Sequence, residues 1–96
     1  MWASTATRRS ARAAMPPSDE AIGAELRALA ARRGPGRSFC PSEAARAMTP
    51  QWRALMPDVR RVADGLCDAG VLEAVQRGAP VDPRTARGPI RLRAPG

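Results

Sequence analysis

Two helix starts lie close together near the middle of the chain, and they constrain the fold more than any other feature. Within residues 40–70, CPSEAARAMTPQWRALMPDVRRVADGLCDAG, both Pro41 and Pro50 suit the first turn of a helix, where a proline loses no backbone hydrogen bond. Glu43 falls at the third position of the first helix, where its carboxylate can accept from the backbone N–H of the capping residue. Two helices with almost no linker between them predict a helix-turn-helix.

The second of these helices carries the main apolar stripe of the chain. At 100° per residue, its apolar side chains fall within one arc of about 140°. They are Trp52, Leu55, Met56, Val59, Val62, Ala63, Leu66 and Cys67. Pro57 interrupts the stripe, and a proline inside a helix costs about 3 kcal/mol. We therefore expect either a kink at Pro57 or a short helix over residues 50–56 followed by a new helix over residues 57–69, with Gly70 as its C-cap.

Another helix and a short strand are expected before this region. Residues 19–33 place apolar side chains at helical spacing, Ser18 is a natural N-cap, and Gly34 ends the segment. Residues 37–39 can form a short strand that points Phe39, the only phenylalanine, into the core.

Two strands joined by a long turn are expected after the helix-turn-helix. Residues 71–76 and 90–93 predict the strands, and residues 77–89, which are rich in glycine and proline, predict the turn. The order helix, short strand, helix, helix, strand, wing, strand is that of a winged helix. We therefore expect an α+β winged-helix domain, with a two-stranded wing, over residues 18–96.

The segment before this domain has no apolar periodicity, so residues 1–17 predict a disordered basic tail. A short arm that contacts DNA phosphates is an alternative, and another is that translation of the native protein begins at Met15. Nothing in the segment resembles a signal peptide, and no stretch has the apolar length of a membrane span. We expect a cytoplasmic protein without membrane association.

The residue types that are missing exclude several chemistries. All 16 basic residues are arginines, and the chain has no lysine or histidine. A phosphate-binding loop lysine, a Schiff-base lysine and a histidine-activated nucleophile are therefore impossible, and zinc would have only Cys40, Cys67 and scattered carboxylates as ligands. We expect neither an enzyme nor a cofactor nor a small-molecule substrate. Both thiols are expected to be reduced and packed, with a disulfide or a reactive Cys40 as alternatives.

The net charge of +7 lies mainly at the two ends of the chain. Residues 71–96 carry five arginines against two acids, which gives +3. A basic excess favours a nucleic-acid partner, although an arginine-only composition is also typical of proteins from GC-rich genomes.

Candidate contact residues at the helix-turn-helix are Gln51, Arg53 and Arg60, because recognition helices present their N-terminal half to base edges. The alternative is a solvated face with a pair between Arg60 and Asp64. The outward charges of this helix sum to zero, which weakens the case for groove recognition. Trp52 is interpreted as a core residue rather than as a stacking platform for a base.

Candidate contact residues in the wing are Arg77, Arg84 and Arg87, which stand among glycines and prolines. An exposed guanidinium can bind two phosphate oxygens at once. The alternative is simple solvation. Glu43 and Arg46, three residues apart, are interpreted as structural: they can pair with each other, cap the helix, or fix its angle to the next one.

Four short motifs, in order, resemble the DUF3253 family: CPSEAAR, then WRALMP followed by VR, then GAPVDP, and finally GPIRLR. The resemblance covers residues 34–93. Proteins of this family are small bacterial domains of unknown function that are winged-helix-like, so the resemblance implies that fold and no established activity.

The leading hypothesis from the sequence is a domain that binds double-stranded DNA through the start of the second helix and the wing. The rival hypothesis is a protein-protein interaction or homodimerisation module, which the charge-neutral helix face favours.

Overall fold

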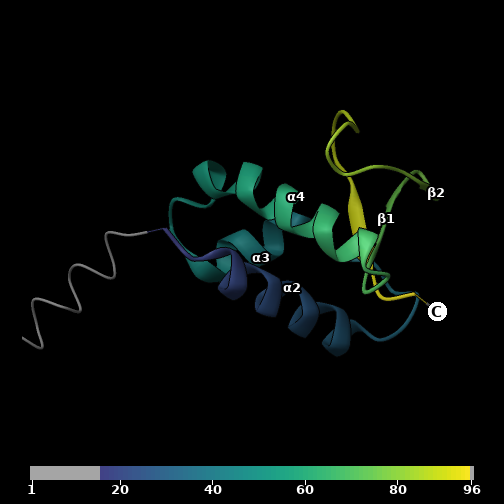
Figure 1. Ribbon diagram of the computed structural model, residues 1–96, viewed down its shortest axis with the longest axis horizontal. Coiled ribbons are helices and arrows are strands. Elements are labelled where there is room, and N and C mark those ends of the chain that lie inside the picture. Colours follow the sequence, from purple (N-terminus) through teal and green to yellow (C-terminus); the bar gives the residue numbers. More distant parts are fainter. Residues whose placement is uncertain (1–15, 96) are drawn as a thin grey trace, which may run out of the picture.

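The computed structural model describes residues 16–95. The predicted tail over residues 1–17 lies outside the described residues except for Pro16 and Pro17, which have no regular secondary structure. The described chain is a small α+β domain with three helices and a three-stranded antiparallel sheet (Figure 1). The elements are α2 (Asp19–Arg33), α3 (Pro41–Met48), α4 (Trp52–Asp68), β1 (Glu73–Gln76), β2 (Ala79–Pro80) and β3 (Arg91–Arg93).

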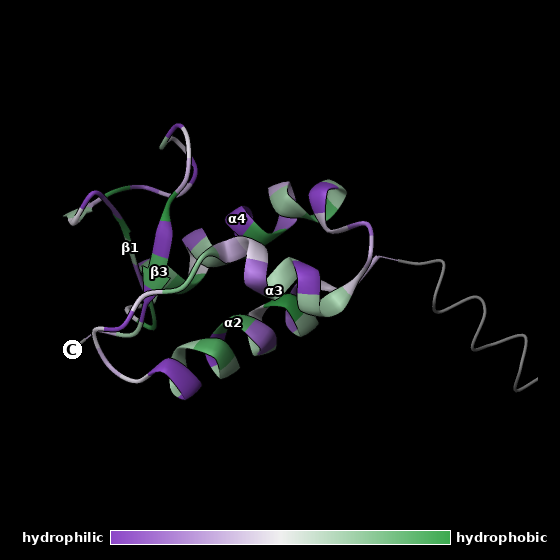
Figure 2. Ribbon diagram, turned by 180° about the vertical axis from the view of Figure 1, so that it is seen from behind, coloured by the Kyte–Doolittle hydropathy of each residue, from purple (hydrophilic) through white to green (hydrophobic). Residues whose placement is uncertain are grey.

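The first helix, α2, has the bounds that the sequence predicts. The Ser18 hydroxyl oxygen accepts from the backbone N–H of Ala21 at 3.1 Å, which satisfies one of the free donors of the first turn. Gly34 ends the helix with φ of 92°, and its N–H donates to the Ala30 carbonyl at 3.0 Å. Hydrophobic and hydrophilic segments alternate along α2 and α4, as expected for helices with one buried face (Figure 2).

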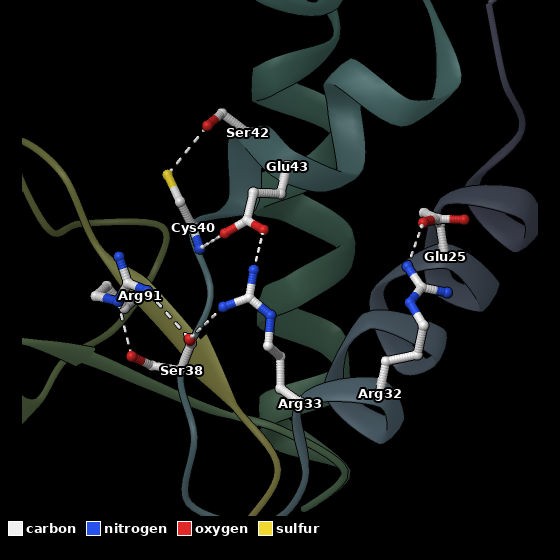
Figure 3. Close-up of polar contacts among 8 residues, drawn as sticks. All are labelled: Glu25, Arg32, Arg33, Ser38, Cys40, Ser42, Glu43 and Arg91. Atoms are coloured by element: carbon white, nitrogen blue, oxygen red, sulfur yellow. Dashed lines mark hydrogen bonds and ion pairs between the residues drawn. The ribbon is translucent and has the colours of Figure 1, made fainter.

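The next helix, α3, also begins as predicted. Its N-cap is Cys40, whose backbone N–H donates to a Glu43 carboxylate oxygen at 2.9 Å. The other Glu43 oxygen accepts from Arg33, which also donates to the Ser38 carbonyl at 3.4 Å (Figure 3). Glu43 thus caps α3 and joins it to the end of α2, and its predicted pairing with Arg46 does not form.

The long helix α4 differs from the prediction at its start, at Pro57 and at its C-cap, which is Ala69 rather than Gly70. It begins at Trp52 rather than Pro50, because Gln51 has non-helical φ and ψ of −88° and 45°. It then continues without a break through Pro57, so of the two predicted alternatives the new helix from residue 57 is wrong. Pro57 has no backbone N–H, so the carbonyl of Arg53, four residues earlier, lacks its helical hydrogen bond. Arg53 lies on an exposed part of the helix, where water can bind this carbonyl.

Burial of the apolar stripe explains why α4 stays continuous. Four of its side chains are at most 8% exposed: Leu55, Val59, Ala63 and Leu66. Because this register runs straight through Pro57, a break there would turn half of the stripe away from the core.

The sheet has the strand order β2-β1-β3, with both pairs antiparallel. The predicted long turn contains strand β2, which forms a tight hairpin with β1. Arg77 and Gly78 join the two strands with φ of 54° and 81°, the two positive values that a type I′ turn needs. Both predicted strands form, but each starts later than predicted, at Glu73 and at Arg91.

Phe39 connects the helical layer to the sheet. It is fully buried, as predicted, and its N–H and C=O each pair with Leu92 at 2.8 Å. The expected short strand is therefore a single bridge to β3. In Figures 1 and 2 the sheet lies beside the C-terminal end of α4, and the start of α4 lies at the opposite end of the helix. Over residues 16–95, no helix has both the length and the apolar character that a membrane span requires.

Candidate functional site

The first group of candidate residues lies at the start of α4. Trp52 packs half-buried against the core, as its place in the apolar stripe predicts. The guanidinium carbons of Arg46, from α3, and Arg53 stand over its ring, 4.3 and 4.4 Å from the centroid. The negative face of an indole attracts cations by roughly 0.5–1 kcal/mol at an exposed site. With the exposed Gln51, these residues form what we call the α4-start cluster: Arg46, Gln51, Trp52 and Arg53.

Both arginines of the α4-start cluster keep their charge uncompensated. Neither forms an ion pair within residues 16–95. Arg46 was not predicted as a site residue, since Glu43 stands at helical pairing distance from it in the sequence. Arg33 forms an ion pair with the Glu43 carboxylate instead, and the Arg46 guanidinium lies over the Trp52 ring. The sequence offered one signal for this contact: Trp52 is close in sequence to both Arg46 and Arg53, and an indole ring attracts guanidinium groups.

Arg60, another predicted contact residue, holds the loop before β3 against the middle of α4. Its guanidinium donates to the carbonyls of Ala86, at 3.2 Å, and Gly88, at 2.8 Å. The predicted alternative, a pair between Arg60 and Asp64, is wrong. A guanidinium bound to two neutral carbonyls retains its positive charge, so Arg60 both fixes the loop and contributes to the field around it.

Arg84, a predicted wing contact, is turned toward α4. Its Nε lies 3.1 Å from a carboxylate oxygen of Asp64, whose side chain is only 13% exposed. Burial raises the pKa of Asp64, and the carboxylates of Asp68 and Asp82 raise it further, while Arg84 opposes the shift. Arg84 therefore serves to balance an acidic cluster, and its charge is compensated within the domain.

The two remaining wing residues, Arg77 and Arg87, line one cleft together with Arg91 from β3. This wing cleft has a volume of about 470 Å³ and reaches Cys40 at the start of α3. The Gln76 side-chain amide fixes its wall by donating to the carbonyls of Arg87, at 2.6 Å, and of Pro89, at 3.0 Å. The lining residues include three arginines and no aspartate or glutamate.

Arg91 is held in place by Ser38. Its Nε donates to the Ser38 hydroxyl at 2.7 Å and one terminal nitrogen donates to the Ser38 carbonyl at 3.0 Å. Arg33 and Arg91 reach this carbonyl from opposite sides (Figure 3). Arg91 lies on the exposed face of its strand, and the sequence gives no cue that Ser38 and Cys40 lie beside it.

The two groups of arginines are connected through Arg60. Arg53 and Arg60 are seven residues apart, which is about two helical turns and about 10 Å along the same side of α4. Arg60 holds the loop that carries Arg87, and Arg87 shares the wing cleft with Arg77. We call this set the basic band: Arg46, Arg53, Arg60, Arg77 and Arg87.

Most other charges outside the basic band are paired. The arginines at positions 32, 33, 61, 84 and 93 form ion pairs with carboxylates, while the exposed Arg27, Arg37 and Arg91 do not. Arg61 holds the pKa of Asp19 below its usual value through a bidentate contact at 2.6 and 2.8 Å. The basic band is therefore a local excess of positive charge on a surface that is otherwise close to balanced.

The cysteines and carboxylates suggest no other chemistry. Cys40 and Cys67 are both free thiols, half-buried, and burial raises the pKa of Cys67. Within the part of the chain that the structure describes, no three cysteine, aspartate or glutamate side chains are grouped so as to hold a metal ion.

Comparison with protein families identifies a match over most of the chain. The model of a protein family described as "Protein of unknown function (DUF3253)" matches residues 19–95, which spans all the helices and strands described above. No curated protein matches the chain.

Proposed function

The chain belongs to the DUF3253 family, whose description assigns no activity, and from the basic band we propose that this domain binds double-stranded DNA as a winged-helix-like module. The order of elements supports the fold assignment. In this proposal α3 and α4 form the helix-turn-helix, and the β1–β2 hairpin together with the loop before β3 forms the wing.

The observation that carries the proposal is the α4-start cluster. Arg46 and Arg53 present two uncompensated charges beside the exposed Gln51 at the beginning of the helix. Recognition helices approach the major groove with this end, and arginine binds both phosphates and guanine edges through paired hydrogen bonds. Because Trp52 packs against both guanidinium groups, they lose less conformational freedom when they bind.

Arg60 and the wing extend the contact in this proposal. About 10 Å separates Arg53 from Arg60 along α4, which is close to the major-groove width of about 12 Å. Arg87, beside Arg60, and Arg77 at the hairpin tip would then lie near the phosphates that border the groove. Arg84, a candidate from the sequence, is not part of the proposed contact because it is paired with Asp64.

The rival function, protein-protein interaction or homodimerisation, has less support. Homodimer interfaces, and the buried centre of other protein interfaces, are more apolar than the rest of the surface. Among the described residues, Val71 is the single large hydrophobic side chain that is exposed, and only to 37%. A charged face without an apolar patch fits a polyanion better than a second protein.

Mapping by NMR tests the proposed surface. When a short DNA duplex is titrated into the isotope-labelled full chain, we expect backbone amide shifts at residues 46–53, at residues 86–88 and at Arg77. The exposed face of α2 around Arg27 should not respond. Absence of shifts, or shifts confined to α2, would rule out this binding surface.

A further inference from the structure

The wing cleft combines features of a small-ligand site that DNA binding does not require. Its volume of about 470 Å³ lies within the range of about 300–1,000 Å³ that is typical of small-molecule pockets. The exposed Pro89 is among its lining residues, so part of the lining is apolar while the arginines supply charge. A single inorganic anion would leave much of this space empty.

The charge of the lining selects the chemical class of the ligand. Arg77, Arg87 and Arg91 bring three positive charges, and no carboxylate of the lining compensates them. A phosphomonoester carries a charge of about −1.5 to −2 at neutral pH and offers three acceptor oxygens, whereas a carboxylate carries only one charge. Each guanidinium group can donate hydrogen bonds to two phosphate oxygens at once.

The walls of the cleft are set before any ligand enters. Ser38 fixes Arg91 through two hydrogen bonds, and Gln76 fixes the loop of Arg87 through two more. The Cys40 thiol, 3.1 Å from the Ser42 hydroxyl, points away from the Glu43 carboxylate (Figure 3). Because these groups need little rearrangement, less of the binding free energy is spent on ordering the site.

We propose that the wing cleft binds a small organic phosphomonoester, with its phosphate held by Arg77, Arg87 and Arg91 and its organic part against the exposed ring of Pro89. Arg77 and Arg87 belong to both the basic band and the cleft, but the α4-start cluster that carries the DNA proposal lies outside the cleft, so this inference does not depend on DNA binding. A phosphate can also come from the DNA backbone, and the test separates the two sources.

Differential alkylation of the two cysteines tests the proposal in the full chain. Cys40 lines the cleft, and Cys67, which lies outside it, serves as an internal reference. The rates of reaction with iodoacetamide are followed by mass spectrometry, with adenosine 5′-monophosphate, inorganic phosphate or a short DNA duplex as the probe. At a concentration of about five times its Kd, the nucleotide should slow alkylation of Cys40 about sixfold, because only the free fraction reacts, and leave Cys67 unchanged.

A cleft variant and a charge-matched control complete the test. The substitutions Arg77→Ala and Arg87→Ala together should abolish the protection of Cys40, while Arg27→Ala with Arg37→Ala, two exposed arginines outside the cleft lining, should preserve it. Protection that survives in the cleft variant would overturn the proposal. So would equal slowing of both thiols, or protection by duplex DNA alone. Protection by the nucleotide with no NMR response to DNA would support the cleft and reject the proposed function.

Discussion

Replacing Phe39 with alanine should lower the free energy of unfolding by about 3–5 kcal/mol, the usual loss when a buried aromatic ring is removed. Phe39 is fully buried, and its backbone pairs with Leu92 in both directions, so the neighbouring elements cannot close the cavity without breaking that bridge. Domains of this size have a total stability of only about 4–12 kcal/mol. The variant should therefore lose a large fraction of this stability and unfold at a lower temperature than the wild type.

Urea denaturation followed by circular dichroism measures this loss. Phe39→Leu is the matched control, because it keeps an apolar side chain in the same space and should lose only about 1–2 kcal/mol. A Phe39→Ala variant within about 1 kcal/mol of the wild type would show that this bridge between helices and sheet is not a central part of the core.

Replacing both Arg46 and Arg53 with alanine should weaken binding to a short DNA duplex by about 20- to 50-fold at low salt, because two phosphate or base contacts are lost. Both side chains are exposed, and their contacts with Trp52 contribute only about 1 kcal/mol each to stability, so the variant should fold. Fluorescence anisotropy measures the affinity, and a thermal melt checks the fold.

The control for this variant removes the same charge elsewhere. Arg27 and Arg37 are exposed and form no ion pair among the described residues, yet they lie outside the basic band. Alanine at both positions should weaken binding only a few-fold, through the change in net charge. If the two double variants lost affinity equally, the α4-start cluster would have no special role.

Local signals in the sequence predicted the elements well. Ser18 and Gly34 mark the ends of α2, and Pro41 with Glu43 marks the start of α3, because each acts on backbone groups within a few residues. The hairpin at Arg77 and Gly78 was missed because an arginine with positive φ is uncommon and Pro80 suggested a break. The continuity of α4 through Pro57 depends on burial of the whole stripe, which outweighs the local cost.

The candidate site was only partly predictable from the sequence. Gln51 and Arg53 lie together, as the position of the helix start implies. The partners of Arg60 and Arg84 could not be predicted, because they depend on the path of the loop before β3 across α4. The association of Arg91 with Cys40 likewise results from the bridge between Phe39 and β3, which joins distant parts of the chain.

The central claim is that the basic band binds DNA phosphates, and the salt dependence of the affinity tests it most directly. Each phosphate contact releases counterions, so about four contacts predict a loss of roughly a hundredfold in affinity for a short duplex between 50 and 200 mM salt. We expect measurable binding of the full chain at the lower concentration and this steep loss at the higher one. No binding at low salt, or an affinity that does not change with salt, would contradict the account.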